Sequence, residues 1–206
     1  MEADRTTTPQ LRDYTSVRRY VLENKRFGQR AEMTVRLSFW FPGHKEFEIL
    51  SEQGSASVRK RVFRKMLESE IEASHDDIRD TTQITPVNYS FRLIGSEALE
   101  GRKSFVLDAL PKSDNKYLFR GKIWVDAKDY GIVRIEGTPA QRPSFWIRRT
   151  SFVHRYDKIG AFWLAVSNTS STDALVFGRT DVRIEYSDYR VNKRSDGSPT
   201  ETGANQ

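Results

Sequence analysis

The sequence contains no cysteine among its 206 residues. This absence excludes a disulfide framework, a thiolate zinc site and a cysteine nucleophile, and it fits any compartment, oxidising ones included. The chain also lacks an uninterrupted apolar run of about 18 residues, so we expect no membrane-spanning helix.

Signature motifs of catalysis are missing as well. The sequence has no phosphate-binding loop, dinucleotide fingerprint or Gly-x-Ser-x-Gly, and a hydrolase using its scattered carboxylates would have no motif behind it. His44, His75 and His154 fall on a turn, a loop and a strand, without a second ligand at metal-binding spacing. An RNP-like run is absent too. We therefore expect no catalytic residues, no metal, no cofactor and no nucleic-acid partner.

The two ends differ in character from the middle of the chain. The first residues, "MEADRTTTPQ", contain no apolar signal-peptide core, which leaves a cytoplasmic protein or a mature chain after signal removal. The last residues, "RSDGSPTETGANQ", are polar and rich in Gly and Pro. We expect a flexible N-terminus over 1–12, a single domain over 13–192 and a disordered tail over 193–206.

What the sequence does have is charge and aromatic residues. Charged residues make up 30% and aromatic residues 12% of the chain, a composition typical of a folded, water-soluble domain. The net charge is +6, which favours anionic partners such as acidic protein or anionic lipid. The charge is spread along the chain, however, so it indicates no particular surface.

Alternation of apolar and polar residues with a period of two dominates the sequence. In the stretch 29–41, for example, Met33, Val35 and Leu37 share one face of a strand. The predicted strands are 14–24, 29–41, 46–51, 87–94, 103–110, 117–126, 132–138, 144–156, 162–171 and 175–191. About ten consecutive strands joined by short turns predict a mainly β (α+β) protein with one curved antiparallel sheet.

One stretch, 56–74, has apolar residues at helical spacing, and Ser55 is a plausible N-cap. A short helical turn is expected near 75–80. Five of the seven residues in 59–65 are cationic, and Glu68, Glu70 and Glu72 follow on the same predicted outer face. Such a helix could lie on anionic lipid or a phosphate backbone, or its charges could form a solvated outer face.

The segment "GKIWVDAKDYGIVRIEG" places Asp126 and Asp129 between two apolar runs. A calcium loop would need an oxygen ligand at the third position, where this sequence has Lys128. We therefore predict a hairpin in which the aspartates cap the turn and Gly131 supplies a positive φ.

Three segments together resemble the outer-membrane lipoprotein-sorting family (LolA/LolB-like) over residues 14–191. They are "YSFRLIGSEALEGRKSFVLDALPK", "GKIWVDAKDYGIVRIEG" and "RIEYSDYRV". The resemblance implies a strongly curved, incomplete β-barrel of about ten strands with a helical lid. It also implies a concave face that carries acyl chains through the periplasm, and hence a periplasmic, non-enzymatic protein.

The predicted function is a periplasmic lipid or lipoprotein carrier that holds acyl chains in a concave cavity. An alternative is a protein-interaction or envelope-sensing module with a filled core, whose partner would be an envelope protein; peripheral membrane contact is left open. Aromatic residues on both faces of several strands fit either a covered sheet or a ligand-binding face. The candidate ligand-binding residues are Val62, Phe63, Met66, Leu67, Phe39, Trp40, Trp124, Phe145, Trp146, Phe152 and Trp163.

Overall fold

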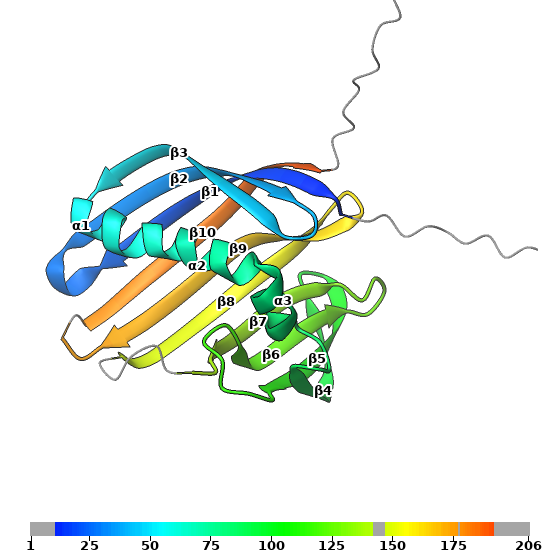
Figure 1. Ribbon diagram of the computed structural model, residues 1–206. Helices are drawn as coiled ribbons and strands as arrows, with labels where there is room; N and C mark the ends of the chain where they lie inside the picture. Colours follow the sequence, from blue (N-terminus) through cyan, green and yellow to red (C-terminus); the bar gives the residue numbers. More distant parts are fainter. Residues whose placement is uncertain (1–10, 142–146, 177, 192–206) are drawn as a thin grey trace, which may run out of the picture.

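The protein is built on one antiparallel sheet of ten strands, seen in a computed structural model that describes residues 11–141, 147–176 and 178–191. The strand order is β3-β2-β1-β10-β9-β8-β7-β6-β5-β4, and the sheet does not close (Figure 1). The predicted mainly β fold with an incomplete barrel is therefore confirmed. The strands are β1 Asp13–Asn24, β2 Gln29–Trp40, β3 His44–Gly54, β4 Tyr89–Leu99, β5 Arg102–Pro111, β6 Phe119–Asp126, β7 Ile132–Pro139, β8 Ile147–Ile159, β9 Phe162–Ala174 and β10 Gly178–Val191.

The helical part lies between β3 and β4. It comprises α1 Ala56–Val58, the π-helical segment η2 Arg59–Phe63 and α2 Arg64–Ser74, which follow one another without a break and are together called the crossing helix. The short helix α3 Asp76–Thr82 follows, where a helical turn was predicted near 75–80. Elsewhere, a 3₁₀ turn, Lys25–Phe27, joins β1 to β2.

The strand order explains why the crossing helix covers a face of the sheet. Strands β3 and β4 are consecutive along the chain, yet they form the two opposite edges of the sheet. The connection between them must therefore pass over one face from edge to edge. Figure 1 shows the crossing helix in front of β1, β10 and β9, with α3 near β7.

The π-helical turn sets which residues of the crossing helix face the sheet. The backbone N–H of Arg64 donates to the carbonyl of Arg59, five residues earlier, instead of four. This wider turn brings Val58 onto the same side as Phe63 and Leu67, and all three are buried. Ser55 takes the predicted N-cap position, but its hydroxyl lies 3.0 Å from the Ser57 hydroxyl and makes no cap bond.

The face beneath the crossing helix can be followed across the whole sheet through directly paired residues. Such pairs point to the same side of a sheet. The row is Glu52, Met33, Tyr20, Ile184, Asn168, His154, Ile135, Ile123, Leu107 and Leu93. Apart from Glu52 at the β3 edge, its members are apolar on both halves of the sheet and polar at the middle, where Asn168 and His154 are opposite each other.

The hairpin between β6 and β7 forms as predicted, but Asp126 alone caps it, because the carboxylate of Asp129 pairs instead with Arg102 and Lys158 at 3.1 and 2.8 Å. The carboxylate of Asp126 accepts hydrogen bonds from the backbone N–H groups of Lys128 and Asp129 at 2.9 and 2.7 Å, so it caps the turn. The positive φ belongs to Tyr130, at 56°, and not to Gly131 as expected. Gly131 is needed for space instead, because a Cβ there would lie 2.1 Å from Cδ1 of Trp163.

Candidate functional site

The crossing helix packs on an apolar area of the sheet. Phe63 has no exposed surface, and its ring centroid lies 6.0 Å from that of Tyr20 on β1. Val62 and Met66 pack at the edge of this area. The first apolar cluster consists of Tyr20, Leu22, Ala31, Met33, Val35, Val58, Phe63, Leu67 and Ile184. The sheet and the helix thus bury one another through side chains that are almost all aliphatic or aromatic.

A second apolar cluster lies on the other half of the same face. It is formed by Tyr89, Ala109, Leu118, Phe119, Ile123 and Ile135. Phe152 packs at its border and meets Phe119 edge to face at 5.7 Å. The helix-side face therefore has two apolar clusters, and the polar middle of the sheet separates them.

A buried ion pair connects the crossing helix to the sheet. Arg18 on β1 is 4% exposed, and its Nη1 lies 2.6 Å from Oε2 of Glu70 on α2. The Nζ of Lys45 lies 2.9 Å from the other oxygen of Glu70. Burial alone would raise the pKa of Glu70, but Arg18 and Lys45 outweigh it and lower the pKa to about 2. Glu70 is therefore ionised throughout the neutral range, and it faces inward rather than outward as expected.

Several other buried titratable groups of the sheet are neutral. Burial lowers the pKa of His154 to about 4, so its imidazole is uncharged at neutral pH. Burial raises the pKa of Tyr20 and that of Tyr156 to about 12, and it also raises the pKa of Tyr186. These tyrosines accordingly keep their hydroxyl protons and can donate hydrogen bonds.

Two further sets of charges hold the crossing helix in place. Near its start, Glu52 of β3 lies 3.3 Å from Arg59 and 3.6 Å from Arg64. Near its end, Lys116 in the β5–β6 loop lies 3.1 Å from Glu72. The helix is thus attached to the sheet at both ends as well as in the middle, by contacts between side chains.

The remaining cations of the helix point to solvent. Lys60, Arg61 and Lys65 are exposed, and among the described residues no carboxylate forms an ion pair with them. The predicted solvated outer face therefore exists, although Arg59 and Arg64 belong to the ion pairs with β3.

The predicted ligand-binding residues divide between the two faces. Val62, Phe63, Met66 and Leu67 all face the sheet, as expected. Phe152 faces the same side, because it pairs through Ser170 with Val182, which packs against the first apolar cluster. Phe145 and Trp146 lie outside the described residues.

Four predicted residues are not at the helix-covered apolar area. Trp124 lies on the opposite face, since it is adjacent to Ile123 in β6, and it forms a separate cluster with Val106, Val133 and Trp163. Trp40 is 42% exposed at the end of β2. Phe39 stacks on Tyr14 at 5.0 Å, beside a hollow of about 230 Å³. Phe39 shares the helix-side face with Met33 but lies beyond the first apolar cluster. Trp124 and Trp163 were included because sequence alternation cannot identify which face of a strand is covered.

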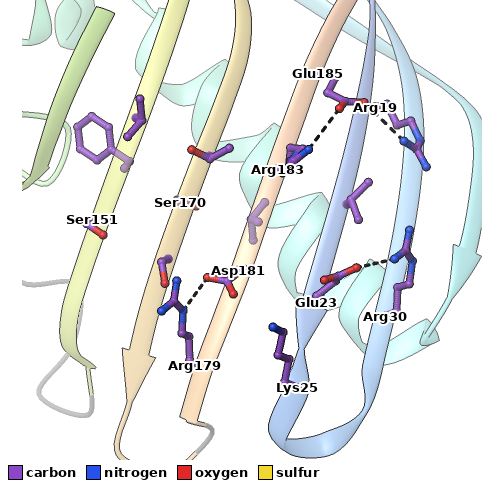
Figure 2. A pocket seen from close by; sticks show the side chains of 16 residues that line it. Arg19, Glu23, Lys25, Arg30, Ser151, Ser170, Arg179, Asp181, Arg183 and Glu185 are labelled. Atoms are coloured by element: carbon purple, nitrogen blue, oxygen red, sulfur yellow. Dashed lines mark hydrogen bonds and ion pairs between the residues drawn. The ribbon is translucent and has the colours of Figure 1, made fainter.

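A hollow of about 660 Å³ lies on the face opposite the crossing helix. Figure 2 shows this face, with the helix behind the strands. Its side chains are mostly charged or hydroxylic, and they pair with one another: Arg179 lies 3.0 Å from Asp181, and Arg19 lies 3.5 Å from Glu185. This lining suits water or a polar partner and does not suit an acyl chain.

Sequence reasoning missed Arg18, Glu70 and His154. A signal for Glu70 existed, because it lies seven residues after Phe63 and therefore on the same side of a helix. Arg18 precedes Tyr20 by two residues and shares its face. Charged residues at apolar positions of the pattern were assigned to solvent, which was wrong for these two.

Within the described residues, no group of three or more potential metal ligands occurs, and no helix is long and apolar enough to cross a membrane.

No family model and no curated protein matches this chain. Solved structures do match, and the three described next each cover 90% of this chain and 88% of their own. An outer-membrane lipoprotein-sorting protein domain from Vibrio parahaemolyticus is 14% identical, with a TM-score of 0.44. A DUF1329 family protein from Desulfovibrio piger is 14% identical, with a TM-score of 0.45. A LolA superfamily protein from Nitrosomonas europaea is 11% identical, with a TM-score of 0.43.

Solved structures of lipoprotein-sorting and LolA-superfamily proteins are thus among those that the chain is similar to.

Proposed function

We propose that this protein is a non-enzymatic carrier or binding protein of the bacterial periplasm that holds acyl chains between the crossing helix and the sheet. The proposal rests on the apolar contact between a helix and one face of an open sheet. Because the helix connects the two edges of the sheet, it can move away without breaking a strand pair. An acyl chain would then replace its side chains on the first apolar cluster.

The apolar contacts that the helix loses on moving away and those that an acyl chain gains are of comparable energy. This balance allows the helix to act as a lid. Burial of Val58, Phe63 and Leu67 contributes about 2 kcal/mol each, or about 6 kcal/mol in total. A buried methylene group contributes about 0.8 kcal/mol, so about eight methylenes offset the loss of these contacts. Acyl chains of common length exceed this number, and their additional methylenes can offset the ion pairs that also hold the helix.

The experiment is crosslinking with a palmitate analogue that carries a diazirine on its chain. Freshly purified protein is first examined by native mass spectrometry for co-purified lipid, then delipidated and crosslinked. We expect adducts on α2, β1, β2 and β10 at residues of the first apolar cluster. The absence of saturable crosslinking, or adducts confined to the cluster around Trp124, would overturn the proposal.

A second candidate function is supported by the close packing of the crossing helix. Phe63 and Leu67 are 0% and 7% exposed, so the helix fills the space that a ligand would occupy. A protein-interaction module would keep this core filled and bind an envelope partner through its charged exterior. Such a module would yield no lipid on organic extraction, and its partner would dissociate with rising salt.

A further inference from the structure

The buried cation Arg18 is the feature from which the inference starts. Its guanidinium lies between two rings, 4.9 Å from the centroid of Tyr186 and 5.5 Å from that of Phe47. Nη1 contacts Glu70, whereas the buried Nε has no hydrogen-bond partner. A guanidinium can donate from Nε and Nη2, whose N–H groups are parallel, to one planar anion. Arg18 therefore has a free donor beside the one that holds the helix.

Among the described residues, the only carboxylate that pairs with Arg18 belongs to the crossing helix, the element that is proposed to move. Glu70 is on α2, while Arg18 and Lys45 are on the sheet, on β1 and β3. The other groups around the guanidinium are the rings of Phe47 and Tyr186 and the hydroxyls of Tyr14 and Tyr20, all uncharged at neutral pH. When the helix leaves, two cations remain on the sheet without an anion.

A ligand that replaces the helix on the first apolar cluster also covers Arg18, because Tyr20 and Arg18 share the same face of β1. Covering a cation without supplying an anion is strongly unfavourable. A neutral hydrocarbon chain would therefore bind poorly, although the apolar surface suits it.

We propose that the ligand is an anionic amphiphile whose head group takes the place of the Glu70 carboxylate on Arg18 and Lys45. This inference rests on the proposed acyl-binding function and specifies its ligand class. A carboxylate or a phosphate head group can accept from Nε and Nη2 of Arg18 together, because these two N–H groups are parallel, with Lys45 as a second contact. The hydrocarbon chain lies along Tyr20, Met33 and Ile184. The ion pair thus acts as an internal competitor that the ligand displaces.

The test compares three ligands with sixteen-carbon chains that differ in head group: palmitate, hexadecyl phosphate and hexadecanol. Binding is measured by displacement of a fluorescent fatty acid from full-length delipidated protein at pH 7.5. We expect palmitate and hexadecyl phosphate to bind at least about tenfold more tightly than hexadecanol, since loss of one partner of a buried charge pair has effects of this size or larger. The relative affinities of palmitate and hexadecyl phosphate identify the preferred anion.

Two variants and a matched control test whether Arg18 causes the preference for anionic ligands. Arg18→Gln should reduce the preference for anionic ligands to about threefold or less, because its side chain no longer carries a charge. Glu70→Gln should tighten binding of both anionic ligands, because it removes the competitor. Arg19→Gln changes the neighbouring arginine, which points to the opposite face, and should leave the preference unchanged.

The outcomes separate this inference from the proposed function. Equal affinities for palmitate and hexadecanol, or weaker palmitate binding by Glu70→Gln, would overturn the inference while leaving acyl binding in place. No binding of any of the three ligands would overturn the proposed function itself. If Arg18→Gln does not fold, Glu70→Gln and the ligand comparison on the unmodified protein still decide the question.

Discussion

Replacing Glu70 by Gln tests how strongly the buried ion pair holds the crossing helix. The substitution keeps the shape of the side chain and removes its charge. Arg18 then loses its anion while it is still buried beneath α2, and Lys45 loses its partner as well. We therefore expect the variant to be less stable than the unmodified protein at neutral pH.

The magnitude follows from the pKa of Glu70. Its ordinary value is 4.5, and Arg18 and Lys45 lower it to about 2 in the folded protein, against the effect of burial. A difference of this size corresponds to about 3 kcal/mol of stability at neutral pH. The Glu70 side chain is 31% exposed, and solvent screening reduces the expected loss to about 2 kcal/mol.

The assay is urea unfolding of both proteins between pH 7 and pH 2. A carboxylate with a lowered pKa stabilises the fold above the unfolded-state pKa, and this contribution is lost as the pH falls through the folded-state pKa. The difference between the two proteins should therefore be constant above about pH 5 and disappear towards pH 2. Glu68→Gln is the matched control, since Glu68 is exposed on the same helix, and it should have little effect.

A loss of stability that is equally large at pH 7 and at pH 2 would refute this reasoning. It would mean that the amide disturbs packing rather than charge. A loss no larger than that of Glu68→Gln would show that the ion pair does not hold the helix.

Three further substitutions test other parts of the structure. Phe63→Ala should cost about 3–5 kcal/mol in urea unfolding, because it leaves a cavity between helix and sheet; a cost under about 1 kcal/mol would mean that the helix is not packed there. His154→Leu should flatten the decline in stability between pH 6.5 and pH 4, because the buried imidazole with a pKa of about 4 resists the protonation that the unfolded chain undergoes; an unchanged slope would contradict this assignment. Gly131→Ala should cost about 1–3 kcal/mol and alter tryptophan fluorescence, since the new methyl group meets Trp163; a neutral effect would show that the ring moves freely.

Much of the fold follows from the sequence because alternation of apolar and polar residues is a local property. The regular pattern of 29–41 and the helical spacing of 56–74 predicted β2 and the crossing helix within about two residues. Strand β8 was predicted from residue 144, and its first described residue is Ile147.

The facing of side chains was harder to predict because it depends on which side of the sheet the helix crosses. Ile123 and Trp124 are neighbours with similar hydrophobicity, yet they lie in different clusters on opposite faces. Similarly, Arg18 looks like a solvent-exposed charge until its pairing with Glu70, 52 residues away, is known. Long-range pairs of this kind leave no local pattern.

The most direct test of the central claim is to measure whether the crossing helix moves away from the sheet when an acyl chain binds. Lys65 on α2 and Lys122 on β6 are both exposed, and each can be replaced by Cys to carry a spin label. Because the chain has no cysteine of its own, only these two positions are labelled. Pulsed electron paramagnetic resonance on the doubly spin-labelled protein should give one distance without ligand and a longer, broader distribution with saturating palmitate. An unchanged distance in protein that has demonstrably bound palmitate would contradict the account.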